Sequence, residues 1–274
     1  MKLHLSLAAV VIALFALSLS VGPAGFARLW HMSGPMPLIL WEIRLPRAIL
    51  AVFIGAGLGL SGAAMQGYLR NPMAEPGILG VSGMAALGAV ISIHFGLAAL
   101  WPLALPFAAL LGAVLGVALI LALSGSRGGS VTLILAGIAI SALAGAFTSL
   151  VLNLAPNPWA ANEIVFWMMG SLADRSWLHV ALACPFILIG AGILLSQGRA
   201  LDALTLGEDA AESLGLRLSH VRLWLVLGTA AVVGAGVAVA GQVVPAQLVA
   251  HHEQQVAQWC LGHGNLHKDG TTLN

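Results

Sequence analysis

The side chains best suited to binding a metal are gathered in the last stretch of the sequence. They are His251, His252, Glu253, Cys260, His263 and His267. Imidazole, thiolate and carboxylate groups are the usual ligands of zinc and related metals. The last three have a spacing that permits chelation, but the first three are consecutive and would point in different directions on a helix. Because no complete ligand pattern appears, we predict that residues 251–274 form a polar, disordered tail without a metal site.

The rest of the sequence is dominated by apolar residues. Of its 274 residues, 59% are hydrophobic and 8% are charged, and the mean hydropathy is +0.98. These values are typical of a polytopic membrane protein and exclude a soluble domain. The formal net charge of +1 leaves no basic stripe that could follow phosphates. The sequence therefore predicts a lipid bilayer as a partner and excludes nucleic acid.

Seven apolar runs are each long enough to cross a bilayer core, which takes about 20 helical residues. They cover residues 5–21, 48–68, 77–96, 97–123, 131–154, 177–196 and 223–244. Lipid offers no partners to exposed backbone groups, so every run is expected to be a helix. The predicted fold is an all-α, polytopic transmembrane bundle that forms one domain over residues 1–250. The first run is also compatible with a secretory signal peptide.

Small residues recur at helical spacing in these runs. They are Gly55, Gly59, Gly112, Gly116, Gly137, Ser141 and Gly145. Small side chains let helix backbones approach closely in a membrane, so these positions predict tight helix packing.

The predicted spans contain no Asp, Glu, Lys or Arg. Ion-coupled carriers and pumps keep ionisable groups at membrane depth, so energy for active transport would have to enter this protein through a loop. A passive channel or a secondary carrier stays open as the alternative. His94 and His179 are single residues near span ends, and we interpret them as packed or interfacial. An intramembrane metalloenzyme would need converging ligands that only the tail offers.

The loop over residues 199–222 is suited to receiving that energy. Its leucines and alanines recur at helical spacing, and its carboxylates form a polar face, which predicts short amphipathic helices on a water-facing surface. Thr205 and Glu208 have the spacing of a capping box. Gly207 permits a sharp break, and Gly215 is a suitable helix stop.

Several ordered motifs resemble those of one family. They are "LGEDAAESLGL" (206–216), "RLPRAILAVFIGAGLGLSGAAMQGYLRNPMAEPGILGVSG" (44–83), "LILAGIAIS" (133–141), "FWMMGSL" (166–172) and "VAVAGQ" (237–242). Together they resemble the permease subunits of binding-protein-dependent ABC importers for iron-siderophore, haem and cobalamin, the FecCD-type family, and the cobalamin permeases in particular. In that family residues 199–222 correspond to the segment that couples to the ATPase, here called the coupling segment.

The resemblance implies partners and roles for particular residues. The partners are a second permease subunit, as a homodimer, two cytoplasmic ATPase subunits and a periplasmic substrate-binding protein. The residues implied in ATPase coupling are Leu204, Gly207, Glu208, Ala211, Leu214 and Gly215. Arg44 and Arg47 correspond to arginines that receive acidic residues of the binding protein, and guanidinium groups form bidentate bonds with carboxylates. An arginine that anchors a helix end is the alternative at both positions.

The family also implies a gate at the cytoplasmic mouth of the pathway. The residues at these positions are Gln66, Asn71, Pro72, Ser130 and Thr132. Val131 stands where the family has a second hydroxyl, and Thr132 is its nearest substitute. The side chain of Gln66 either bonds to a neighbouring helix, which we favour, or faces the pore.

Further implications concern chemistry, location and length. The chain itself would be neither an enzyme nor a cofactor carrier, and it would lie in the bacterial inner membrane. Loop charges give six basic residues against four, which favours a cytoplasmic N-terminus. Family members continue after the seventh span with about three more spans of about 20 residues, to about ten in all. Here only Val243, Val244 and Pro245 keep a trace of that pattern, so we expect a truncated or frame-shifted chain whose transport competence is in question. The sequence does not identify the ligand.

Overall fold

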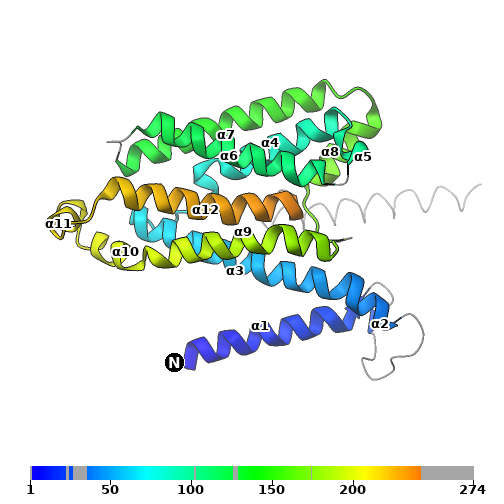
Figure 1. Ribbon diagram of the computed structural model, residues 1–274, viewed down its shortest axis with the longest axis horizontal. Helices are drawn as coiled ribbons and strands as arrows, with labels where there is room; N and C mark the ends of the chain where they lie inside the picture. The colour runs from blue at the N-terminus through cyan, green and yellow to red at the C-terminus, as the bar shows by residue number, and fades with distance from the viewer. Residues whose placement is uncertain are drawn as a thin grey trace, which may run out of the picture.

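The computed structural model describes residues 2–22, 25–26, 36–101, 103–125, 129–173 and 175–241. Most of these residues are helical, and the long helices lie side by side in one elongated bundle (Figure 1). The predicted all-α bundle is therefore confirmed. The candidate metal ligands, the tail over residues 251–274 and residues 243–245 lie outside the described residues.

The elements follow one another in the order labelled in Figure 1. The first are α1 (Lys2–Ser20), the antiparallel strands β1 (Val21–Gly22) and β2 (Gly25–Phe26), α2 (Met36–Ile39), the π-helix η1 (Leu40–Arg44) and α3 (Leu45–Leu69). Next come the 3₁₀ helix η2 (Pro76–Leu79), α4 (Val81–His94), α5 (Leu97–Leu100), α6 (Ala104–Ser124), α7 (Ser130–Asn153) and α8 (Pro158–Met168). The last are α9 (Trp177–Ser196), α10 (Gly198–Leu204), α11 (Glu208–Ser213) and α12 (Leu218–Ala240).

Five helices are long and apolar enough to cross a membrane. They are Pro37–Leu69, Ala104–Ser124, Ser130–Asn153, Trp177–Ser196 and Leu218–Ala240. The first and third predicted spans correspond to shorter apolar helices, Leu5–Ser20 and Val81–His94. The sixth predicted span has the bounds of α9, and the fifth differs from α7 by one residue at each end.

The second, third and fourth predicted spans are joined or divided differently in the structure, and the seventh begins earlier, at Leu218. The second begins earlier than predicted, because α2, η1 and α3 follow one another without a gap, and so Arg44 and Arg47 lie within the helical stretch. The third is divided at Gly80, where φ is 72° and η2 gives way to α4. The fourth is divided at Trp101, whose backbone is extended (φ −149°, ψ 120°). Trp101 precedes Pro102 in the sequence, and a residue before proline disfavours the helical conformation.

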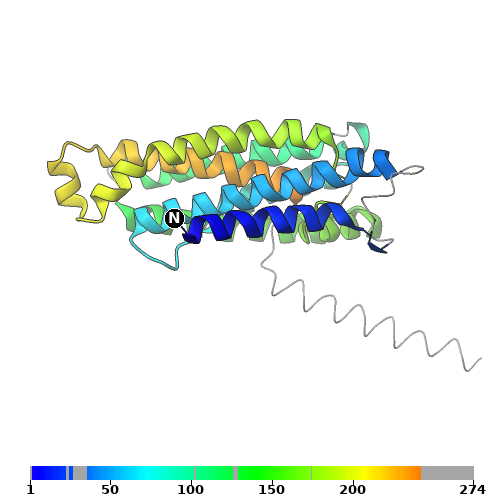
Figure 2. The same ribbon diagram turned by 90° about the horizontal axis from the view of Figure 1, so that it is seen from below.

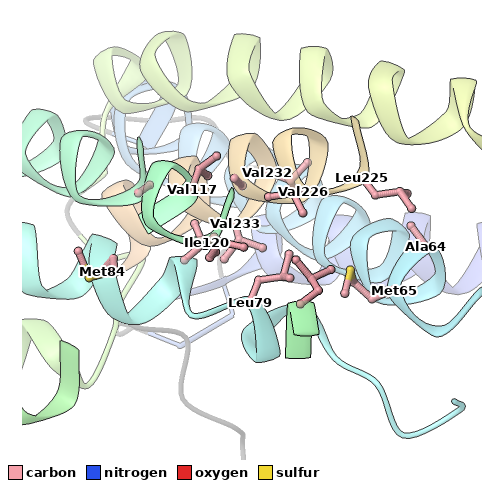
Figure 3. Close-up of a cluster of buried hydrophobic side chains, with 14 of the residues drawn as sticks. Ala64, Met65, Leu79, Met84, Val117, Ile120, Leu225, Val226, Val232 and Val233 are labelled. Atoms are coloured by element: carbon pink, nitrogen blue, oxygen red, sulfur yellow. The ribbon is translucent and has the colours of Figure 1, made fainter. Parts of the chain in front are cut away.

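The central helix of the bundle is α12. It lies between a layer of α4, α6 and α7 and a layer of α3 and α9 (Figure 1). In its most apolar window 78% of the residues are buried, against at most 39% in the other four long helices. A helix that is apolar on all sides belongs in the interior. Figure 3 shows side chains of this core, among them Leu225, Val226, Val232 and Val233 of α12 and Val117 and Ile120 of α6.

Close backbone contacts hold α4 against α6 and η2 against α7. A Cβ atom at Gly112 would overlap the carbonyl oxygen of Met84, and one at Gly137 would overlap that of Ile78. These contacts confirm the predicted close packing, as does Gly116 against Met84. Within one copy of the chain, the prediction of close packing is wrong for three glycines. Gly55, Gly59 and Gly145 face away from the other described residues.

Candidate functional site

Two short helices protrude from one end of the bundle. α9 ends at Ser196, α10 and α11 follow, and α12 leads back into the bundle, as both views show (Figures 1 and 2). Leu204, at the end of α10, is 2% exposed, and Ala211 in α11 is fully buried. These two side chains anchor the coupling segment to the bundle. The short amphipathic helices predicted here are confirmed.

The break between α10 and α11 differs from the predicted capping box. Gly207 precedes α11 with φ 110° and ψ 159°, and no side chain caps this helix. Thr205 instead follows the last residue of α10, and its hydroxyl donates to the carbonyl oxygen of Asp202 at 2.6 Å. The predicted capping box is wrong, because a threonine hydroxyl can bond back to a carbonyl three residues earlier as easily as forward. The predicted break at Gly207 is confirmed, since this backbone region is open to glycine alone.

The end of α11 is a glycine stop, as predicted. Gly215 has φ 86°, and its N–H donates to the carbonyl oxygen of Glu212 at 2.8 Å. The N–H of Leu216 then donates to the carbonyl oxygen of Ala211 at 3.2 Å. This pair of bonds is the Schellman closure, which satisfies carbonyls at a helix end and turns the chain sharply.

The outer face of the coupling segment combines carboxylates with exposed leucines. Leu206 is 71% exposed and Leu214 is 67% exposed. Asp202, Asp209 and Glu212 are also exposed on these two helices. Large apolar side chains among charges, on a part that protrudes beyond the spans, favour contact with another protein over contact with lipid.

A cavity of about 490 Å³ separates the coupling segment from the ends of the spanning helices. It is lined by Tyr68, Gly129, Ser130, Leu204, Glu208, Glu212, Leu216, Arg217, Leu218 and Ser219. The structure thus brings Ser130, a predicted gate residue, to the same cavity as Leu204 and Glu208 of the coupling segment. Thr132, the other predicted hydroxyl, is exposed on α7 and does not line this cavity.

The remaining gate residues form the connection between α3 and η2. The side-chain amide of Gln66 donates to the carbonyl oxygen of Pro72 at 3.0 Å. Asn71 accepts a bond from the backbone N–H of Met73 at 2.9 Å. The preferred interpretation of Gln66 as bonding to a neighbouring helix is therefore wrong, since its partner lies in its own turn. The last turn of α3 packs on α10, because a Cβ atom at Gly67 would contact Leu201 at 3.6 Å.

The two arginines of the docking prediction have different surroundings at the opposite end of the bundle. Arg44 is half-buried and donates to the carbonyl oxygen of Leu19 at 2.8 Å, which ties η1 to the end of α1. Arg47 is exposed. The indole N–H of Trp177 donates to the carbonyl oxygen of Trp41 at 3.0 Å, and the two rings lie 5.2 Å apart. The π-helix therefore joins α1, α3 and α9.

The two isolated histidines serve structural roles, as interpreted from the sequence. The ring of His94 meets that of Phe95 edge-on at 5.2 Å. Nδ1 of His179 accepts a bond from the backbone N–H of Ser176 at 3.3 Å, which caps the start of α9. Among the described residues, no group of three or more His, Cys, Asp or Glu could hold a metal ion.

Sequence reasoning missed Arg222, which it placed in a loop. α12 begins at Leu218, so Arg222 lies in its second turn, and its side chain is 5% exposed. Its guanidinium donates through Nη2 to the carbonyl oxygen of Gly125. The prediction that no span contains a charged residue is thus wrong for α12, and also for the helix Pro37–Leu69, which contains Glu42, Arg44 and Arg47. The signal was present, since Arg222 stands one turn before the buried Leu225 and Val226 and so shares their face.

Sequence reasoning also missed α8, which lies between the fifth and sixth predicted spans. The side chain of Asn157 accepts a bond from the backbone N–H of Ala160 at 2.9 Å, and Pro158 is the first helical residue. An Asn followed by Pro is a helix start signal that the sequence contained.

Comparison with known proteins identifies the family. Residues 5–255 match the FecCD transport family.

This chain belongs to the FecCD transport family.

Its FecCD relatives are permeases of several import systems. The chain is 37% identical to the hemin transport system permease protein HmuU of Yersinia pestis, over 89% of this chain and 74% of the relative. It is 34% identical to the Fe(3+) dicitrate transport system permease protein FecD of Escherichia coli, over 91% of this chain and 78% of the relative. It is 34% identical to the vitamin B12 import system permease protein BtuC of Salmonella newport, over 90% of this chain and 76% of the relative.

A solved structure agrees with this FecCD assignment. A metal-chelate type ABC transporter in an inward-facing conformation matches with a TM-score of 0.79 and 29% identity, over 88% of this chain and 79% of that chain. Together with the long apolar helices, these matches confirm the predicted permease subunit and its place as a multi-pass protein of the inner membrane.

Proposed function

We propose that this FecCD permease forms half of the translocation pathway of an ATP-driven importer, over a single domain of residues 1–250. A second copy of the chain forms the other half. Two cytoplasmic ATPase subunits each hold one coupling segment, and a periplasmic binding protein delivers the ligand. ATP hydrolysis takes place on the ATPase subunits, and the permease itself carries no cofactor. Nucleotide-driven closure of the ATPases shifts the population between inward-facing and outward-facing states.

The geometry of the coupling segment carries this proposal. Its buried Leu204 and Ala211 hold it to the bundle, whereas Leu214 projects outward for a partner. Gly207 and Gly215 set the two turns that shape the segment. Glu208 is half-buried and lines the cavity between α11 and the ends of the spanning helices.

The cargo is a metal chelate of the kind that the relatives transport. Hemin, Fe(3+) dicitrate and vitamin B12 are named for relatives of similar identity. We propose an iron chelate, haem or a cobalamin as the ligand. Comparable identities to all three give no reason to prefer one of them.

Outward-facing glycines support a second copy of the chain as the other half of the pathway. Gly55 and Gly59 on α3 and Gly145 on α7 lie on the outer surface of the bundle. Glycines at such positions allow close approach of another helix within a membrane. The proposed gate combines Ser130 and Thr132 at the start of α7 with the turn of Gln66, Asn71 and Pro72.

The decisive experiment substitutes the coupling segment. The chain is reconstituted in liposomes with its ATPase subunit and its binding protein, and ATP hydrolysis is measured with and without ligand. Leu214→Asp is expected to abolish ligand-stimulated hydrolysis while membrane insertion stays intact. Ser213→Ala, on the neighbouring exposed residue, is the matched control. Unchanged stimulation in Leu214→Asp would refute the role of this segment. Uptake that proceeds without ATP would favour the alternative, a channel or secondary carrier.

A further inference from the structure

Arg222 is the only charged side chain that is buried in the part of the chain that the structure describes. It lies in the second turn of α12, close to the end of the bundle from which the coupling segment protrudes. Burial removes the water that a guanidinium binds, which costs several kcal/mol unless protein groups replace it. The bonds of this guanidinium with protein groups therefore replace part of its hydration.

The guanidinium connects α12 to the end of α6. Its Nη2 donates to the carbonyl oxygen of Gly125, the first residue after α6. Carbonyl groups at the C-terminal end of a helix carry partial negative charge and attract a cation. Arg222 therefore fixes the end of α6 to the start of α12.

Tyr68 brings α3 and the coupling segment to the same point. It lies in the last turn of α3, is 7% exposed, and interacts electrostatically with both Arg222 and Glu208. Glu208 is the first residue of α11, and it lines the cavity together with Tyr68. The charges of Arg222 in α12 and Glu208 in α11 thus both act on Tyr68 at the end of α3.

The cavity limits direct contact between α11 and the start of α7. It lies between α11 and the start of α7, so these two elements do not pack tightly where Glu208, Glu212 and Ser130 line it. A close-packed interior transmits displacement, whereas an open space absorbs it.

We propose that Arg222 is the positioning residue through which movement of the coupling segment reaches α3, α6 and α12 together. Its guanidinium donates to the carbonyl oxygen of Gly125 at the end of α6, a bond that the shorter-reaching ammonium group of a lysine forms less well. This inference rests on the proposed function, because it assumes that a nucleotide-driven partner moves the coupling segment.

The test uses two distances in the complete complex with its ATPase subunit, with Cys184 and Cys260 changed to serine. Spin labels on Ser213→Cys and Leu178→Cys report the coupling segment against the far end of α9. The distance between labels on Leu123→Cys and Leu178→Cys reports the position of the end of α6 relative to the same reference point in α9. Each labelled chain is diluted with unlabelled chain, and distances are compared without nucleotide and with ATP plus vanadate.

In the chain with native Arg222, both distances are expected to change with nucleotide. In Arg222→Met the coupling-segment distance still changes and the α6 distance does not. Arg70→Met, an exposed arginine at the end of α3 outside the coupling segment, is the control and keeps both changes. Arg222→Lys preserves the buried charge and is expected to fold, with a smaller change at α6.

Two results would overturn this inference. The first is a nucleotide-dependent change of the α6 distance in Arg222→Met that is as large as in the native chain. If the methionine variant does not fold, the same result in Arg222→Lys counts instead. Either result would refute the role of Arg222 and leave the proposed function standing. If neither distance responds to nucleotide in the chain with native Arg222, the proposed function fails and this inference fails with it.

Discussion

Arg44 and Arg47 lie one helical turn apart, yet their side chains have different environments. The guanidinium of Arg44 donates a hydrogen bond to the carbonyl oxygen of Leu19, whereas the side chain of Arg47 is exposed. We therefore propose that docking of a binding protein depends mainly on Arg47, and that Arg44 anchors the helix end, which was the alternative interpretation.

Charge reversal separates these two roles. Arg47→Glu is expected to slow association of the binding protein about tenfold at low salt, because a rim charge acts chiefly on the association rate. Arg44→Met is expected to lower the melting temperature of the detergent-solubilised chain instead. Surface-bound permease and soluble binding protein provide the rates, measured at several salt concentrations. Equal association rates in Arg47→Glu and the native chain would contradict the docking role.

Gly137 offers a test of the close packing between η2 and α7. A Cβ atom at this position would overlap the carbonyl oxygen of Ile78, which belongs to backbone and cannot rotate away. Gly137→Ala is expected to destabilise the fold by about 1–3 kcal/mol, the usual cost of overpacking. Gly192→Ala lies in α9 and also faces open space, so it should leave the melting temperature unchanged or raise it slightly. Equal effects of the two substitutions would argue against this packing.

The coupling segment depends on its two left-handed glycines as much as on its helices. Gly207 and Gly215 have φ of 110° and 86°. Alanine at either position is expected to cost about 1–2 kcal/mol locally and to displace α11. Gly198→Ala, which has open space and no positive φ, is the control. We expect lower affinity for the ATPase subunit in the first two variants, measured by co-purification. Native affinity in both would show that the segment adapts without this backbone shape.

Helix bounds show how far sequence reasoning reaches. α9 was predictable to the residue because polar residues flank its apolar run on both sides. The divisions at Gly80 and Trp101 were not predictable from hydropathy. Apolar residues continue through both positions, and hydropathy carries no signal for a turn inside an apolar run. The extension through η1 was missed because Glu42 and Arg44 resemble loop residues, although a long helix can carry them beyond the lipid.

The arrangement of the whole bundle determines which predicted residues meet. Ser130 shares a cavity with the coupling segment, although they are far apart in the sequence. The family motifs indicated these positions. Their proximity depends on the fold, because α3 ends, and α7 and α12 begin, at the same end of the bundle (Figure 1). The bond partner of Arg222 depends on the fold in the same way, because Gly125 follows the end of α6 and only the fold brings the two residues together.

The measurement that tests the central claim most directly is ATP-dependent uptake in liposomes that contain this permease, its ATPase subunit and its binding protein. Hemin, Fe(3+) dicitrate and cobalamin are offered separately, with ATP or a non-hydrolysable analogue enclosed. We expect one of these chelates to accumulate only with ATP, and Leu214→Asp to abolish the accumulation. No accumulation of any chelate, or accumulation that is equal with and without ATP, would contradict the account of an ATP-driven permease.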